Sequence, residues 1–110
     1  MFVYRGWIGD AGSPHTRFKL ALRTGNVHLI ETAALELPKV GLQDALSILV
    51  VLATTGDVRY ERAAAKWAAR AVSERRLTLA ESRRLLALVE VLPEAPEAVA
   101  QSLRSYCRPR

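Results

Sequence analysis

The sequence predicts an all-α fold of five to six antiparallel helices, and three observations support this. Apolar residues recur at helical spacing in one segment after another. Capping residues and prolines mark the ends of most of these segments. Two stretches of the chain also resemble each other at an offset of 37 residues, a period typical of helix-pair solenoids. We therefore expect a short α-solenoid-like stack of two helix pairs with a capping helix on each side.

Length and composition favour one ordered domain. The chain has 110 residues, of which 50% are hydrophobic and 25% charged, which excludes a disordered chain. The longest apolar runs, 48–53 and 85–89, are far shorter than the ~20 residues that cross a bilayer. We expect no membrane span and a cytoplasmic protein. Cys107 is the only cysteine, so no internal disulfide forms, and we expect a surface thiol near the chain end.

Residues 1–12 are predicted to form an extended N-terminal arm. Three glycines make this segment too glycine-rich for a stable helix. It also carries Phe2, Tyr4 and Trp7, whose side chains prefer burial. We expect the arm to lie over the helical body or over a neighbouring subunit, which makes these three aromatic residues candidates for self-association into a homodimer.

The first two helices are predicted from their ends. Ser13 is a good N-cap for a helix over 14–23, and Asn26 caps a second helix over 27–37 that Pro38 stops. The residues expected to face inward are Phe18, Ala21 and Leu22 in the first helix, and Val27, Ile30, Ala33, Ala34 and Leu37 in the second.

The third and fourth predicted helices differ in pattern. The segment 42–54 is apolar nearly all round, which is typical of a central helix with several neighbours. The segment 58–75 is the longest helix, and its many alanines allow close packing. Its expected inward residues are Tyr60, Ala63, Ala64, Trp67, Ala68 and Ala71.

The last two helices complete one predicted domain over 13–107. Thr78 and Glu81 form a capping box at the start of a helix over 79–92. Its expected inward residues are Leu85, Leu86, Leu88, Val89 and Leu92. A shorter helix over 97–106 follows, and residues 108–110 are expected to be a flexible tail.

The internal repeat aligns the segments that begin at Lys39 and Arg76 without a gap, with Leu42 opposite Leu79. Helices two and three then correspond to helices four and five, and Ile30 corresponds to Trp67. Stacked helix pairs bury their exposed faces on one another. Two amphipathic helices with similar caps also align by chance, so a true duplication and a mere structural similarity both stay open. The tetratricopeptide consensus is not matched at its Trp, Gly, Tyr and Pro positions.

The segments 21–26, 36–40 and 42–46 carry a resemblance to a group of proteins. They read Ala-Leu-Arg-Thr-Gly-Asn, Glu-Leu-Pro-Lys-Val and Leu-Gln-Asp-Ala-Leu. In these the chain resembles small, uncharacterised Ala- and Arg-rich helical proteins of actinobacteria, over about two thirds of its length. The resemblance implies no activity, cofactor or site.

The sequence offers little for catalysis. His28 and Glu31 share a helix face, but a four-helix di-metal site needs a second Glu-x-x-His pair and two further glutamates. A solvated helix face is the alternative reading of this pair. No serine or cysteine pattern around His15 suggests a nucleophile for it to activate. The glycines do not form a phosphate-binding loop. We expect no enzyme, no metal site and no cofactor, and no small-molecule ligand is evident from the sequence.

The fourth helix carries a basic ridge. Four basic residues fall within about 80° on a helical wheel, opposite the Trp67 face; they are Arg59, Arg62, Lys66 and Arg70. The formal net charge of +5 also favours anionic partners. The alternatives are a solvated outer face and an arginine-rich composition typical of GC-rich genomes. Residues 77–82 open like a helix-turn-helix, but 87–92 continue as helix where the turn should come.

Two function hypotheses follow from these patterns. The first is a non-catalytic helical protein-interaction module, a small regulator or adaptor, with a protein or a second copy as its partner. The second is non-specific nucleic-acid binding through the basic ridge.

Overall fold

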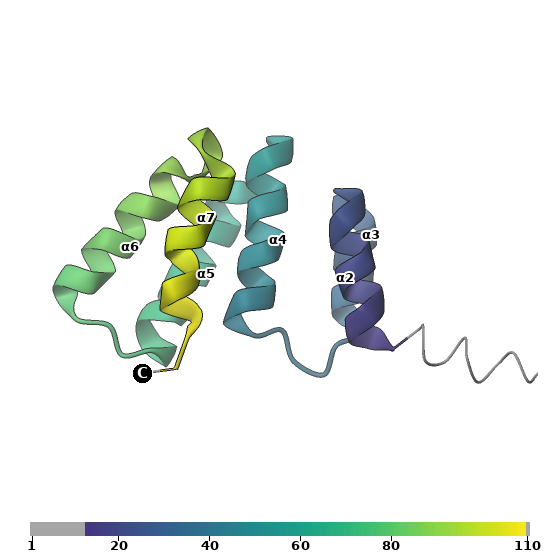
Figure 1. The fold of residues 1–110 in the computed structure, drawn as a ribbon, viewed down its shortest axis with the longest axis horizontal. Coiled ribbons are helices and arrows are strands. Elements are labelled where there is room, and N and C mark those ends of the chain that lie inside the picture. Colours follow the sequence, from purple (N-terminus) through teal and green to yellow (C-terminus); the bar gives the residue numbers. More distant parts are fainter. Residues whose placement is uncertain (1–12, 110) are drawn as a thin grey trace, which may run out of the picture. The chain divides into compact units, whose positions relative to one another are not determined.

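The computed structural model describes residues 13–109, and Figure 1 shows that they form helices joined by short turns. Six α-helices and two short 3₁₀ helices occur within these residues, and no strand does. The all-α prediction with five to six helices is confirmed. The chain divides into two compact units between Val40 and Gly41. Each unit is described by itself, and the single domain over 13–107 stays a prediction. The predicted arm over 1–12 lies outside the described residues.

The first unit contains α2 (Pro14–Thr24) and α3 (Val27–Leu35). Both predicted N-caps are confirmed. The Ser13 hydroxyl accepts the Thr16 amide at 3.2 Å, and the Asn26 side chain accepts the Leu29 amide at 3.2 Å. Gly25, with φ of 68°, closes α2 in the left-handed conformation that favours glycine.

The structure corrects the predicted end of α3 and shows which side chains of this unit are buried. The helix ends at Leu35, two residues before its predicted end. The amides of Glu36 and Leu37 bond to carbonyls three residues back, so the chain tightens before Pro38. The buried residues are Phe18, Ile30 and Ala33.

The second unit contains the other six helices. They are α4 (Leu42–Thr55), α5 (Tyr60–Glu74), α6 (Leu79–Val91), η1 (Leu92–Glu94), α7 (Pro96–Arg104) and η2 (Ser105–Cys107). Within this unit α4 contacts α5, α7 and η1, so its predicted central position is confirmed. The largest fully buried side chains of the core are Leu46, Leu49, Leu85, Leu92 and Leu103.

The starts of α5 and α6 follow from side-chain hydrogen bonds. Asp57 accepts the amide of Arg59 at 2.8 Å, and this turn delays α5 to Tyr60, two residues after the predicted start. At α6 the predicted capping box is confirmed. The Thr78 hydroxyl accepts the Glu81 amide at 3.1 Å, and the Glu81 carboxylate accepts the Thr78 amide at 2.8 Å.

Two expectations about side-chain exposure are wrong. Leu86 was expected inside, but it is 53% exposed because α6 turns this face away from its neighbours in the unit. Cys107 was expected at the surface, but it is buried. Here η2 returns the chain to the core, and the guanidinium of Arg75 donates to the Cys107 carbonyl at 2.8 and 3.2 Å. Burial raises the pKa of the Cys107 thiol.

Candidate functional site

The basic ridge lies on the outer side of the second unit, and half of its charges are paired. Arg62 and Lys66 are exposed on α5. Arg70 is half-buried and pairs with Glu74 at 2.9 Å. Arg59 was predicted within the helix over 58–75, but it lies in the turn before α5. Arg62, Lys66 and Arg70 therefore share α5, and of the four predicted residues only Arg62 and Lys66 lie outside the ion pairs that the structure shows there.

Asp57 forms an ion pair with Arg59, the first residue of the basic ridge. Its carboxylate accepts Nε and a terminal nitrogen of the Arg59 guanidinium, each at 2.9 Å. The hydrogen bonds from the side chain and the backbone amide of Arg59 lower the pKa of Asp57 to about 2. The anion of Asp57 therefore persists well below the pH at which an ordinary aspartate is protonated.

This geometry predicts an acid-dependent contribution to stability. A carboxylate whose pKa is lower in the folded chain stabilises the fold above its unfolded pKa of 3.8, and the contribution is lost as the pH falls towards 2. We expect the stability advantage of the wild type over Asp57→Asn to shrink between pH 5 and pH 2. Urea unfolding at each pH measures it, and an advantage that stays constant over this window would contradict the assignment.

The outer face of α6 carries an apolar strip that sequence reasoning missed. Leu79 and Leu86 are 70% and 53% exposed. They are seven residues apart and therefore lie on the same face of the helix. Arg83, between them on this face, is exposed as well. We call Leu79, Arg83 and Leu86 the α6 strip.

A groove between α5 and α6 adjoins this strip. It has a volume of about 680 Å³ and is lined by Leu86, by small side chains and by charged ones, among them Arg83, Glu61 and Glu90. The small ones are Ala64, Ala65 and Ala87. Because alanine side chains are short, another helix approaches such a surface closely.

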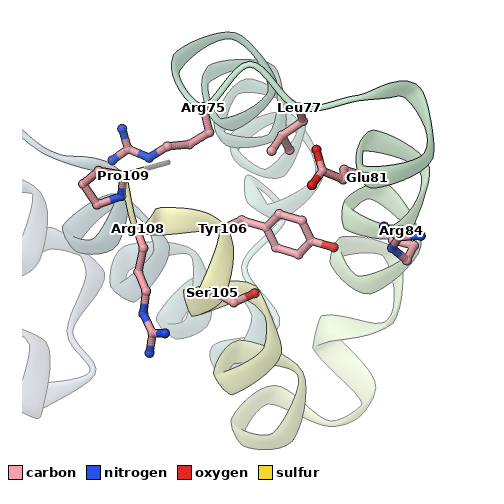
Figure 2. Close-up of a pocket in the computed structure, with 8 residues that line it drawn as sticks. All are labelled: Arg75, Leu77, Glu81, Arg84, Ser105, Tyr106, Arg108 and Pro109. Atoms are coloured by element: carbon pink, nitrogen blue, oxygen red, sulfur yellow. The ribbon is translucent and has the colours of Figure 1, made fainter.

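A second concave site lies at the C-terminal end of the unit (Figure 2). Its volume is about 350 Å³. Its polar lining comes from the end of α5, from α6 and from η2 and the residue after it: Arg75, Glu81, Arg84, Ser105, Tyr106 and Arg108. We call this the C-terminal pocket. The arginine pairs at 75–76 and 83–84 are visible in the sequence. No sequence pattern indicated that Tyr106 lines this pocket.

The remaining candidates form no grouped site. His28 and Glu31 are both exposed on α3. In residues 13–109 no group of three or more His, Cys, Asp or Glu side chains is close enough to hold a metal ion. Phe2, Tyr4 and Trp7 lie outside the described residues, so their role in self-association stays a prediction.

Comparison with known proteins adds nothing to this geometry. The chain matches no family model, no curated protein and no solved structure. Between residues 13 and 109, every helix is too short or too polar to cross a membrane.

Proposed function

We propose that this chain is a non-catalytic helical module that binds a protein partner through the outer face of α6. The observation that carries the proposal is the exposure of Leu79 and Leu86 on one face. Single exposed leucines are ordinary on protein surfaces. Two on one helix face, beside a groove lined partly by alanines, form a larger apolar surface of the kind that marks interaction sites.

The internal repeat supports this use of the α6 strip. At the offset of 37 residues, Leu79, Arg83 and Leu86 align with Leu42, Leu46 and Leu49 of α4. Those three leucines are at most 3% exposed, and they belong to the core that α4 forms with α5 and α7. The face that α4 buries inside the unit is therefore the face that α6 presents outside.

A solenoid-like arrangement accounts for this difference. In this proposal α3 with α4 and α5 with α6 are two repeats, and α2 and α7 are caps. Each repeat of a solenoid covers the exposed face of the one before it. Helices α3 and α4 fall into different compact units. We therefore propose, as part of this solenoid, that α3 and α4 form the first repeat. The α6 strip is then the position that a further helix, supplied by a partner, occupies.

The chemistry of the strip defines the partner. Leucines on either side of Arg83 favour an amphipathic helix with apolar residues at spacings of three and four, because these form one apolar stripe. The exposed guanidinium of Arg83 favours an acidic side chain within that stripe. We therefore propose an amphipathic helix of another protein, with an acidic residue facing Arg83, as the partner; a second copy of this chain is the alternative outcome.

Site-specific crosslinking tests the proposal. A photoreactive residue is placed at position 86 in the native host, and a matched one replaces Ala69, an exposed alanine on α5. We expect position 86 to crosslink to an amphipathic helix that position 69 does not capture. Crosslinks to this chain itself would identify a homodimer instead. Equal labelling at the two positions, or none at position 86, would contradict a binding face on α6.

Self-association through the aromatic arm, residues 1–12, is tested separately. Phe2, Tyr4 and Trp7 each bury about 150–250 Å² when covered. Reciprocal exchange of two arms therefore buries about 900–1,500 Å², near the area of a stable interface. If the arm drives dimerisation, light scattering after size exclusion gives a dimer for the full chain and a monomer after deletion of residues 1–12. The same mass for both chains would refute a role for the arm.

Non-specific nucleic-acid binding is the second candidate function. Arg62 and Lys66, adjacent and exposed on α5, favour it. If the ridge contacts phosphates, each lost contact flattens the plot of log affinity against log salt by about 0.9. We expect the Arg62→Gln, Lys66→Gln variant to flatten the slope for a short DNA duplex by about 2. Arg23→Gln, which removes a charge from α2, is the control. An unchanged slope in the ridge variant would exclude this surface.

A further inference from the structure

The first unit has a groove of its own between α2 and α3. It has a volume of about 340 Å³ and is lined by residues of both helices. Its apolar side chains are Leu20 and Ala21 of α2 and Leu29 and Ala33 of α3. Leu20 and Leu29 are 51% and 48% exposed, although leucine is one of the residues that folded chains most often bury. Two half-exposed leucines from different helices therefore line one groove.

The polar side chains that line this groove already have partners within the unit. The hydroxyls of Thr24 and Thr32 donate to backbone carbonyls of their own helices, at 2.6 and 3.0 Å. The guanidinium of Arg17 pairs with the carboxylate of Glu36 at 2.7 Å. Because these polar groups bond to one another or to the backbone, the surface left for an occupant is the apolar one. The groove therefore favours apolar side chains.

The two helices of this unit also have a small core. Between residues 13 and 40 the buried side chains are those of Phe18, Ile30 and Ala33. Units below about 40 residues usually need a disulfide, a metal or association with another surface to be stable. The α2–α3 pair therefore gains stability from any further apolar segment that covers its groove.

The chain carries a suitable apolar segment directly before α2. Within residues 1–12, the apolar side chains larger than alanine are Met1, Phe2, Val3, Tyr4, Trp7 and Ile8. The six residues between Trp7 and the cap at Ser13 span up to about 20 Å when extended. Leu20 lies about 10 Å beyond Ser13 along the axis of α2. The connection is therefore long enough to reverse and bring Trp7 over the groove.

We propose that residues 1–12 cover the α2–α3 groove of their own chain, with the Trp7 ring against Leu20 and Leu29. The groove volume of about 340 Å³ is near the lower end of small-molecule sites, roughly 300–1,000 Å³, so it suits a few large side chains. Gly9 and Gly12 allow the chain to reverse before α2, because glycine adopts conformations that other residues avoid. Since the segment and the groove belong to one chain, their effective concentration is high, and weak contacts are enough to hold them together.

Nuclear Overhauser effects in the full chain test this contact directly. With leucine methyl groups labelled, we expect cross-peaks from the Trp7 ring to the methyl groups of Leu20 and Leu29, and Trp7→Phe identifies the ring signals by removing them. A mixture of labelled and unlabelled chains separates contacts within one chain from contacts between two copies. Contacts within one chain would support the proposal. Contacts only between copies, or none to either leucine, would overturn it.

Fluorescence quenching of Trp7 is the second measurement, in a chain whose other tryptophan is changed by Trp67→Phe. The added substitutions Leu20→Ser, Leu29→Ser are expected to raise the acrylamide quenching constant several-fold and to shift the emission to longer wavelength. Leu35→Ser is the control and is expected to change neither, because Leu35 is 86% exposed on α3 and does not line the groove. Circular dichroism checks that each variant is folded. Equal quenching in all three chains would overturn the proposal.

Discussion

Replacing Trp67 with alanine is expected to lower the free energy of unfolding by about 3–5 kcal/mol. Trp67 is 3% exposed in the core of the second unit. Its indole N–H donates to the Leu42 carbonyl at 2.9 Å and so joins α5 to the first turn of α4. The substitution leaves a cavity and also removes the donor from a buried carbonyl. Urea unfolding followed by circular dichroism at 222 nm measures the loss.

The control for Trp67 is phenylalanine, which keeps an aromatic ring and removes the N–H group. Because the Leu42 carbonyl then lacks its partner, Trp67→Phe is expected to cost about 1–3 kcal/mol, less than Trp67→Ala. A loss below about 1 kcal/mol for the alanine variant would place Trp67 outside the core, since buried tryptophans cost far more.

Substitution of two aligned leucines is expected to give opposite results. Leu49→Ala is expected to cost about 2–5 kcal/mol, because large-to-small changes in a core leave a cavity. Leu86→Ala, at the aligned position in α6, is expected to cost at most about 0.5 kcal/mol, as ordinary surface substitutions do. The difference follows from their exposures of 1% and 53%.

Urea unfolding of the two variants provides the comparison. Both remove the same atoms from a helix interior, so helix propensity affects them alike. Equal losses would mean that the two faces are covered alike in the folded chain. The α6 strip would then be part of the core, and no binding face would remain there.

The local features of this fold could be predicted from the sequence. Ser13, Asn26 and Thr78 all cap helices as expected. A cap depends on hydrogen bonds to amides two or three residues away, so the residues needed are adjacent in the sequence. The delayed start of α5 has a local cause too, because the Asp57 side chain competes for the Arg59 amide.

The features that depend on distant residues could not be predicted. Helical periodicity placed Leu86 on an apolar face, but it does not reveal whether a neighbour covers that face. Cys107 is buried because the chain returns to the core at η2, close to Arg75. Likewise, the C-terminal pocket depends on residues from separate elements. The repeat gave no sign that Leu86 is exposed either, because it aligns Leu86 with Leu49, which is buried.

The most direct test of binding through α6 is the dissociation constant of the partner captured at position 86, measured with purified proteins. We expect Leu79→Ser, Leu86→Ser to weaken binding at least about 30-fold, which corresponds to the roughly 2 kcal/mol of an interface hot spot. Ala69→Ser on α5 is expected to leave the constant unchanged. If the double variant binds as tightly as the wild type, the outer face of α6 is not the binding surface.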